Sequence, residues 1–284
     1  MPGTFVSIRS LFPRLRRRSR HLLNRLGLWW DWAAGRTVVR PPPDELVQGI
    51  GGAWWIGEHF LGHFRNLCDL KPDEVVLDVG CGVGRMAVPL TGYLSPKGRY
   101  EGFDIMLKNV NWCRRAIARR WPNFRFQHAD IYNREYNPQG PVHCSQYRFP
   151  YPDRTFDFAF LTSVFTHLMP PDAAHYLREV ARVLKPGARC LATFFLLNDE
   201  SNALVDSGKA LFALHPMEGN CRVHNREVPE ACLALDESYV DRAAHAAGLV
   251  IERPVRYGSW SGRTPAFDFQ DIVILHKPAR PEFS

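Results

Sequence analysis

The sequence predicts an α/β fold built on a doubly wound sheet of seven strands, mostly parallel, with the last strand antiparallel. Apolar runs of strand length alternate along the chain with stretches of helical periodicity, which is the pattern of a parallel sheet wrapped by helices on both faces. A glycine-rich turn joins the first strand to a helix. The last two strands are connected by residues 258–265 without a helix, so we expect the final strand to run antiparallel.

Each element follows from its residue pattern. Strands are short apolar runs bounded by turn residues, and helices carry apolar residues three and four positions apart. In the first helix these positions hold Trp55, Ile56, Phe60, Leu61, Phe64 and Leu67. We expect strands at Val75–Val79, Tyr100–Asp104, Phe124–His128, Phe156–Leu161, Arg189–Phe195, Val250–Tyr257 and Asp271–His276. We expect helices at Ala53–Leu70, Gly84–Leu94, Leu107–Arg120, Asp172–Leu184 and Glu237–Ala247.

The charge of the chain is divided at a proline-rich break. Residues 1–40 contain nine Arg and one acid, a net charge of +8 against +7 for all 284 residues, so the remainder sums to −1. Pro41-Pro42-Pro43 is a stiff segment. We therefore expect a basic N-terminal arm over residues 1–43, frayed or amphipathic, and a single α/β domain over residues 44–280. Because the folded part lacks a positive excess, no nucleic-acid partner is expected.

One long segment departs from the alternation of strands and helices. Residues 198–235 lie between the fifth strand and the last helix and are of mixed composition. Long segments of this kind in α/β enzymes are often lids or binding walls. We predict that residues 198–235 form a lid or one wall of a substrate pocket.

Cysteine usage and hydropathy favour a reducing, cytoplasmic setting. The seven cysteines are odd in number and include no Cys-x-x-Cys pair, which argues against a disulfide framework. No apolar run reaches the roughly 18 residues that a membrane span needs. Residues 1–30 combine seven Arg and no acid with scattered Leu, Phe and Trp. That composition suits peripheral contact with an anionic membrane or, in a eukaryotic source, an organelle transit segment.

The glycine-rich turn is the clearest binding motif. The first strand ends at Asp78-Val79, and Gly80, Gly82 and Gly84 follow at alternate positions. Glycine tolerates positive φ and has no Cβ, so the chain can turn sharply and let a ligand touch the backbone. The start of the next helix favours an anionic group. Arg85 stands where a dinucleotide fingerprint has its third glycine, which argues against a nicotinamide-dependent oxidoreductase.

This stretch resembles the Asp/Glu-x-Gly-x-Gly-x-Gly motif of class I S-adenosylmethionine-dependent methyltransferases, and the resemblance covers about residues 53–195. It implies a Rossmann-like fold with S-adenosylmethionine as cofactor and S-adenosylhomocysteine as product. In that family the loop binds the methionine part of the cofactor, and the leading acid helps to position its amino end. The resemblance assigns these roles to Asp78, Gly80, Gly82 and Gly84, with Cys81 between them.

Acids at the ends of the next two strands match the family pattern in order. Asp104 ends the second strand, where a carboxylate can accept both ribose hydroxyls in nucleotide-binding folds. The resemblance makes Asp104 the ribose clamp, with Ile105 beside it. By the same resemblance, Asp130 at the end of the third strand accepts from the adenine amino group, and Ile131 flanks the ring.

The loop after the fourth strand covers the sulfonium side of the cofactor in this family. It contains Ser163 and His167. His167 lies at the carboxyl edge of the sheet, where α/β sites form, and its titration range suits proton transfer. We predict His167 as a general base and Trp112, Tyr132 and Trp260 as walls of the acceptor pocket, with packing in the core or loop as the alternative for each.

These features predict an enzyme that moves a methyl group by in-line displacement to a nitrogen, oxygen or carbon acceptor. Aromatic residues around the predicted pocket favour a small-molecule or lipid-like acceptor. A non-catalytic binding or scaffold protein of the same fold stays open as an alternative, because fold alone does not set function. An oxidoreductase has less support.

No metal ion is expected from the sequence. His59 and His63 are four residues apart on the first helix, a spacing that can place two ligands on one helical face. The sequence does not indicate a third ligand.

The basic arm leads to a first testable prediction. A cationic stretch with apolar residues binds anionic bilayers, so the full chain should co-sediment with phosphatidylserine liposomes at low salt. A chain lacking residues 1–40 should remain in solution and keep its affinity for S-adenosylhomocysteine. Liposome binding that survives the deletion would contradict this role of the arm.

Overall fold

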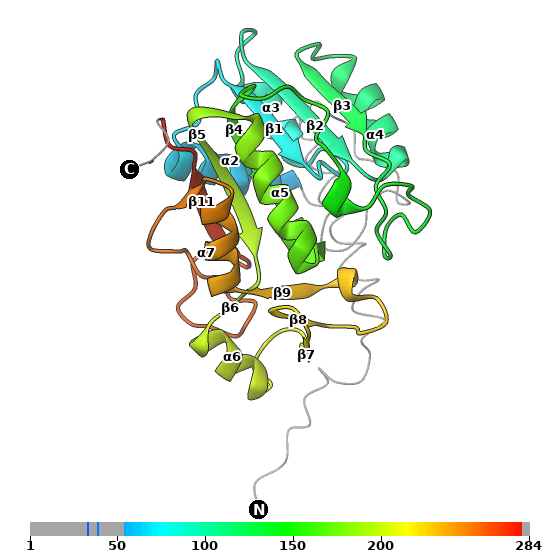
Figure 1. The fold of residues 1–284 in the computed structure, drawn as a ribbon. Helices are drawn as coiled ribbons and strands as arrows, with labels where there is room; N and C mark the ends of the chain where they lie inside the picture. The colour runs from blue at the N-terminus through cyan, green and yellow to red at the C-terminus, as the bar shows by residue number, and fades with distance from the viewer. Residues whose placement is uncertain (1–32, 34–38, 40–53, 280–284) are drawn as a thin grey trace, which may run out of the picture.

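A seven-stranded sheet runs through the computed structural model, which describes residues 33, 39 and 54–279 (Figure 1). Apart from residues 33 and 39, the predicted arm of residues 1–43 lies outside the described residues. The strand order is β10-β11-β5-β4-β1-β2-β3. The chain runs outward from β1 through β2 to β3 and then returns to β4 on the other side of β1. Ligands bind at such a reversal of strand order in open α/β sheets.

The direction of the strands confirms the predicted fold class. Five strands pair in parallel: β1 (Val75–Val79), β2 (Arg99–Asp104), β3 (Phe124–His128), β4 (Phe156–Leu161) and β5 (Leu184–Phe194). The last strand, β11 (Asp271–His276), is antiparallel both to β5 and to the short edge strand β10 (Val250–Ile251). The sheet is therefore mostly parallel with an antiparallel last strand.

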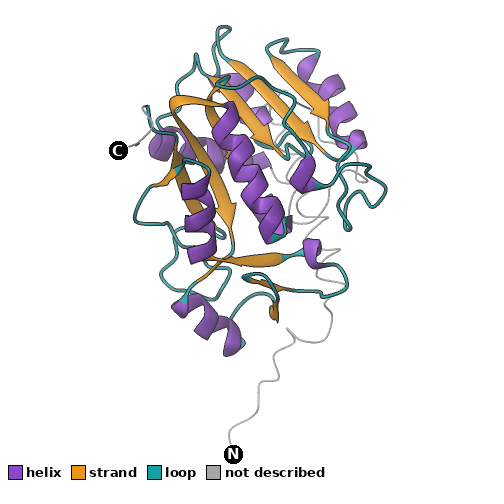
Figure 2. Ribbon diagram, viewed as in Figure 1, coloured by secondary structure: helices purple, strands orange, loops and turns teal. Residues whose placement is uncertain are grey.

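Helices cover both faces of the sheet (Figure 2). One face carries α2 (Trp54–Cys68), α3 (Ala87–Tyr93) and α4 (Leu107–Cys113), which continues as a π-helical turn over Arg114–Ala118. The other face carries α5 (Pro170–Val183) and α7 (Glu237–Ala246). None of the described helices is both long enough and apolar enough to cross a membrane.

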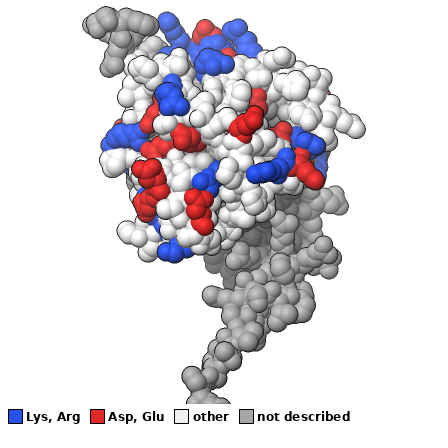
Figure 3. All heavy atoms as spheres, turned by 60° about the horizontal axis from the view of Figure 1, so that its bottom comes forward, with Lys and Arg blue, Asp and Glu red and all other residues white. Residues whose placement is uncertain are grey.

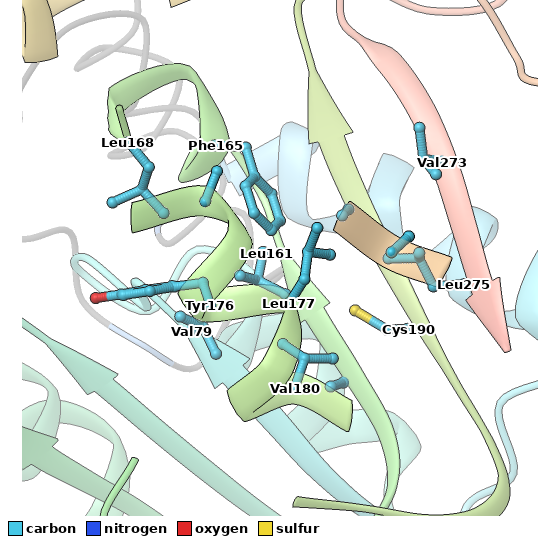
Figure 4. Packing of buried hydrophobic residues seen from close by; sticks show 14 of the residues in the cluster. Val79, Leu161, Phe165, Leu168, Tyr176, Leu177, Val180, Cys190, Val273 and Leu275 are labelled. Atoms are coloured by element: carbon cyan, nitrogen blue, oxygen red, sulfur yellow. The ribbon is translucent and has the colours of Figure 1, made fainter. Parts of the chain in front are cut away.

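Each face of the sheet has its own hydrophobic core, because side chains along each strand point alternately to the two faces. In β1, Val76 belongs to the core beneath α2 to α4, whereas Leu77 and Val79 belong to the core beneath α5 and α7. Figure 4 shows part of the second core, where Leu177 and Val180 of α5 lie against the strands. All of these residues are only 0–1% exposed, so the strands are held from both sides.

Several predicted elements differ in their bounds from those observed; the fifth strand, for example, begins at Leu184 and not at Arg189. The expected strand Val250–Tyr257 is only two residues long, because Pro254 has no N–H to donate to the sheet, and pairing resumes only as a bridge between Arg256 and Ile272. The helix expected from Gly84 begins at Ala87. Gly84 has a φ of +73°, which a right-handed helix excludes.

Residues 196–236 form a second, smaller sheet at the carboxyl end of β5 (Figure 1). The helix α6 (Asp199–Asp206) follows its first strand and is capped by Asn198, whose side chain accepts from the Ser201 N–H at 3.0 Å. The strands lie in the order β6-β9-β8-β7, and they are β6 (Leu196–Leu197), β7 (His215–Met217), β8 (Cys221–Val223) and β9 (Leu233–Asp236). Strands of two to four residues are too short for a visible alternation in the sequence.

A buried carboxylate joins the two sheets. Asp271 at the start of β11 accepts from the N–H groups of Leu196 and Gly258, both at 2.7 Å, and from the indole N–H of Trp260 at 2.8 Å. Burial raises the pKa of Asp271 to about 6, although these three donors lower it. Trp260 was expected to wall the acceptor pocket. The structure places it in the core instead, 1% exposed and packed against Phe195.

Candidate cofactor and acceptor site

The glycine loop is fastened to the end of β2 by its backbone. The N–H groups of Gly80 and Cys81 both donate to the Phe103 carbonyl, at 2.9 and 3.0 Å. The Gly82 N–H donates to Asp104 Oδ2 at 2.8 Å. The path of the loop is therefore set by the strand beside it and by the acid that ends that strand.

The three glycines of the loop have different surroundings although each has a positive φ, of +77°, +52° and +73° in chain order. A Cβ on Gly80 would lie 2.7 Å from Val164, and one on Gly84 would lie 2.7 Å from Ile117. A Cβ on Gly82 would meet no atom within 4 Å. Gly80 and Gly84 thus allow close packing, whereas Gly82 borders open space in which a ligand can approach the backbone.

Asp78 lies beneath this loop and is 1% exposed. Its Oδ2 accepts from the Tyr100 hydroxyl at 2.5 Å, whereas its Oδ1 has no hydrogen-bond partner among the described residues. Burial raises the pKa of Asp78 to about 7, and the hydrogen bond from Tyr100 opposes that rise. A buried acceptor without a donor is costly, so an ammonium group would fit here.

Asp104 is buried and already has a structural role. Oδ2 accepts from Gly82, and Oδ1 accepts from the Met106 N–H at 2.8 Å. Burial raises the pKa of Asp104, against the effect of these two hydrogen bonds. Each carboxylate oxygen has a second lone pair, so ribose hydroxyls can still be accepted. Ile105, which follows, is half-buried, and its carbonyl accepts from the His128 ring at 3.2 Å.

The structure separates the two predicted adenine contacts. The Ala129 N–H donates to the Asp104 carbonyl at 3.0 Å, which brings Asp130 beside the end of β2. Asp130 is exposed, and its Oδ1 accepts from the Asn137 amide at 2.9 Å. Ile131 is 0% exposed and belongs to the core on the α5 face. Of the two residues, Asp130 is the one that presents its side chain at the surface.

Ser163 holds the loop after β4 in a strained conformation. Its φ is +59°, a region that costs a residue other than glycine free energy. The Ser163 N–H donates to Thr193 Oγ1 at 2.8 Å, and its hydroxyl contacts Gln270 Oε1 at 2.9 Å. These bonds tie the loop to β5 and to the segment before β11, and they place the next residue, Val164, against Gly80.

His167 contacts the segment that leads into the smaller sheet. Its Nδ1 lies 2.8 Å from the Glu230 carbonyl. Because a carbonyl only accepts, Nδ1 carries the proton and Nε2 keeps its lone pair. Burial lowers the pKa of His167, although the bond to Glu230 raises it. A neutral imidazole with a basic Nε2 is the form that a general base requires.

The partners of His167 could not be predicted from the sequence. The rings of His167 and Tyr136 are nearly perpendicular, with their centroids 5.2 Å apart, and Glu230 lies 63 residues away in the chain. Neither residue belongs to a motif. The contacts arise because the turn Phe165–His167 packs against the turn Pro229–Ala231.

The predicted aromatic walls of the acceptor pocket lie in different parts of the structure. Trp112 of α4 is 7% exposed within the core beneath α2 to α4. Tyr132 is half-buried, with its ring 5.2 Å from that of His143. Trp260 belongs to the core of the smaller sheet. The structure therefore does not gather Trp112, Tyr132 and Trp260 into one wall.

Comparison with known proteins finds similarity to methyltransferases in the part of the chain that contains this loop. Residues 76–187 match a family model described as a methyltransferase domain. The 27-O-demethylrifamycin SV methyltransferase of Amycolatopsis mediterranei is 30% identical over 135 residues, 46% of this chain and 42% of that protein. The demethylmenaquinone methyltransferase of Bacillus cereus is 26% identical over 130 residues, 45% of this chain and 48% of that protein.

A solved structure supports the fold. The PH0226 protein of Pyrococcus horikoshii superposes with a TM-score of 0.53 at 18% identity, over 78% of this chain and 88% of that one. At that identity the likeness concerns the fold alone. The chain matches less than half the length of each of the two relatives, 42% and 48%.

The pKa of Asp78 gives a prediction for ligand binding. S-adenosylhomocysteine carries an ammonium group, and Asp78 must ionise to accept from it. Because the pKa of Asp78 is raised to about 7 in the ligand-free protein, binding at pH 7 should release part of a proton. Affinity should fall by up to about tenfold for each pH unit below 7.

Calorimetry in buffers of different ionisation enthalpy measures this proton release. Asp78→Asn should abolish it, whereas Asp199→Asn, which alters an exposed acid of α6, should leave it unchanged. A wild-type protein that takes up a proton on binding would show that Asp78 does not meet the ammonium group.

Proposed function

We propose that this chain, which carries a domain of the class I S-adenosylmethionine-dependent methyltransferase family, transfers a methyl group to a small-molecule or lipid-like acceptor. The proposal rests on an oxygen that is unpaired among the described residues and on an empty space at the glycine loop. Asp78 Oδ1 is buried without a donor among the described residues, and the space beside Gly82 is open. Both features fit a ligand that has an ammonium group and an aliphatic segment lying close to the protein backbone.

The residues of the loop and the neighbouring strand ends would hold the cofactor in sequence. Asp78 would accept from the amino group of the cofactor, and the methionine part would lie along the backbone at Gly82. Asp104 would accept from the ribose hydroxyls, and Asp130 would accept from the adenine amino group. When bound, S-adenosylmethionine supplies a methyl group on positively charged sulfur and leaves as a neutral product. The protein therefore needs to orient the acceptor and exclude water rather than stabilise a developing anion.

His167 is the residue that we assign to proton removal from the acceptor. An amine or hydroxyl that is protonated at working pH must lose its proton as the new bond forms. Nε2 of His167 has the lone pair for that task, and the Glu230 carbonyl keeps the Nδ1 proton in place. Contact with Glu230 also connects His167 to residues 198–235, the predicted lid or wall.

Several observations support a small or lipid-like acceptor. Residues 198–235 expose two large apolar side chains, Leu211 at 61% and Met217 at 36%. Figure 3 shows acidic and basic side chains interspersed on the face that it displays, without a continuous basic track of the kind that binds phosphates. Both relatives are named for the methylation of small molecules. The basic arm of residues 1–40 would suit a cytoplasmic enzyme that meets a lipid-like acceptor at a membrane surface.

Binding of S-adenosylhomocysteine tests the cofactor part of the proposal. The wild-type protein should bind one equivalent in calorimetry. Gly82→Ala should weaken binding at least about tenfold, because the new Cβ enters the space that the ligand needs. Gly248→Ala is the matched control, since Gly248 also has a positive φ, +77°, and also borders open space. It should share the cost of a strained alanine, about 1 kcal/mol, without weakening binding. A wild-type protein that does not bind would contradict the proposal.

Transfer of a labelled methyl group to fractions of a cell lysate tests catalysis and identifies the acceptor. With that acceptor, His167→Gln should keep its affinity for S-adenosylhomocysteine and lose about 10²–10⁴-fold in kcat. His175→Gln, which removes another imidazole bound to a carbonyl, should retain activity. Unchanged turnover in His167→Gln would exclude it as a base. Cofactor binding without labelling of any fraction would favour the scaffold alternative.

A further inference from the structure

Three side chains that can bind metals converge outside the cofactor loop. His59 and His63 lie one turn apart on α2, and Asp268 lies on the loop before β11. Asp268 Oδ2 is 2.8 Å from Nε2 of His59 and 2.8 Å from Nε2 of His63, and the two Nε2 atoms are 3.0 Å apart. Among the described residues, this is the one group of three His, Cys, Asp or Glu side chains whose ligand atoms lie within 4.8 Å of one another.

Hydrogen bonds alone do not account for this arrangement. The Phe269 N–H donates to the other oxygen of Asp268, and an ionised carboxylate only accepts hydrogen bonds. If both Nε2 atoms carry protons toward it, two donors face each other at 3.0 Å. If one Nε2 lacks its proton, its lone pair faces the carboxylate at 2.8 Å. No placement of the ring protons satisfies all three contacts.

A cation satisfies the three contacts together, because each atom then presents a lone pair to it. Nitrogen and oxygen ligands about 2.0–2.1 Å from a tetrahedral zinc ion are about 3.3 Å apart. The three atoms, at 2.8–3.0 Å, would need to separate by only a few tenths of an ångström. Two imidazoles and a carboxylate also suit zinc and the neighbouring divalent transition metals better than they suit calcium or magnesium.

The surroundings of the carboxylate resemble those of a metal ligand. Its second oxygen, Oδ1, accepts from the Phe269 N–H at 2.6 Å, and such an outer contact fixes the orientation of a ligand. The side chain of His59 is 44% exposed, whereas those of His63 and Asp268 are 13% and 16% exposed. One side of the group is therefore open to solvent, where water can complete the coordination.

We propose that His59, His63 and Asp268 form a binding site for a divalent transition-metal ion, with three protein ligands and one open position. The site connects residues 209 positions apart in the chain, so an ion there fastens the first helix to the loop before the last strand. Both segments border the loops described above. A Cβ on Gly57 of α2 would lie 2.1 Å from the Arg85 carbonyl, and Gln270, two residues after Asp268, contacts Ser163. The ion would brace the carboxyl edge of the sheet from outside.

Zinc binding to the full, untagged chain tests the site without reference to methyl transfer. After removal of metals by a chelator, calorimetry with Zn²⁺ should show one equivalent of saturable binding. Zinc in excess should also raise Tm by several degrees, because a ligand of the folded state stabilises it. Co²⁺ in place of zinc should give the absorption of a nitrogen- and oxygen-ligated ion, without the thiolate charge-transfer band that a cysteine site would produce.

Variants connect the binding to the three residues. Asp268→Asn and His63→Ala should each weaken Zn²⁺ binding by at least about tenfold and remove the rise in Tm, with circular dichroism showing that both variants remain folded. His276→Ala is the matched control, since it removes another His–carboxylate contact, that with Glu252 at 2.9 Å, and should bind zinc like the wild type. Absence of saturable binding, binding that survives Asp268→Asn, or a thiolate band would overturn the proposal.

Discussion

The contact on which the candidate site depends is that between the end of β2 and the glycine loop. The Phe103 carbonyl accepts two consecutive N–H groups of the loop, and the Asp104 carboxylate accepts the next free one, from Gly82. The loop is therefore held open before any ligand arrives, and binding need not order it, which reduces the entropy cost of association. A simple truncation of Asp104 would therefore not separate its structural role from the ligand contact that we propose for it, since its loss would also release the loop.

The sequence was most informative where a signal is local. Strands buried on both faces, such as Val75–Val79 and Phe156–Leu161, have the bounds that their apolar runs predicted. Asp78 and Asp104 were placed at strand ends, and parallel strands bring such ends to one edge of the sheet. Prediction was weaker where tertiary context decides. The edge strand that begins at Val250 is shorter than its apolar pattern predicted. Trp260 is buried and donates to the Asp271 carboxylate, which belongs to no obvious motif.

Contacts between distant segments could not be predicted from periodicity or motifs. His59 and His63 are visible as a pair because helical spacing is a local property, but Asp268 meets them only after the sheet closes with its antiparallel last strand. His167 was identified by its position after β4, whereas its partner is a backbone carbonyl. Every residue has a backbone carbonyl, so the sequence does not show which one binds His167. In both cases the sequence indicated one side of an interaction and the fold supplied the other.

The residues that we propose for the cofactor come earlier in the chain than the segments that we propose for the acceptor. The match to the methyltransferase domain ends at residue 187, and it includes every predicted contact to the cofactor. The segments that we propose for the acceptor side come later in the chain, as the smaller sheet of residues 196–236 and the loop before β11. Buried acceptors anchor these segments to the main sheet, notably Asp271 to Leu196 and Gly258. Because the proposed cofactor contacts lie in the matched part and the proposed acceptor contacts lie in the later segments, likeness in the matched part supports a class of acceptor and does not specify the acceptor itself.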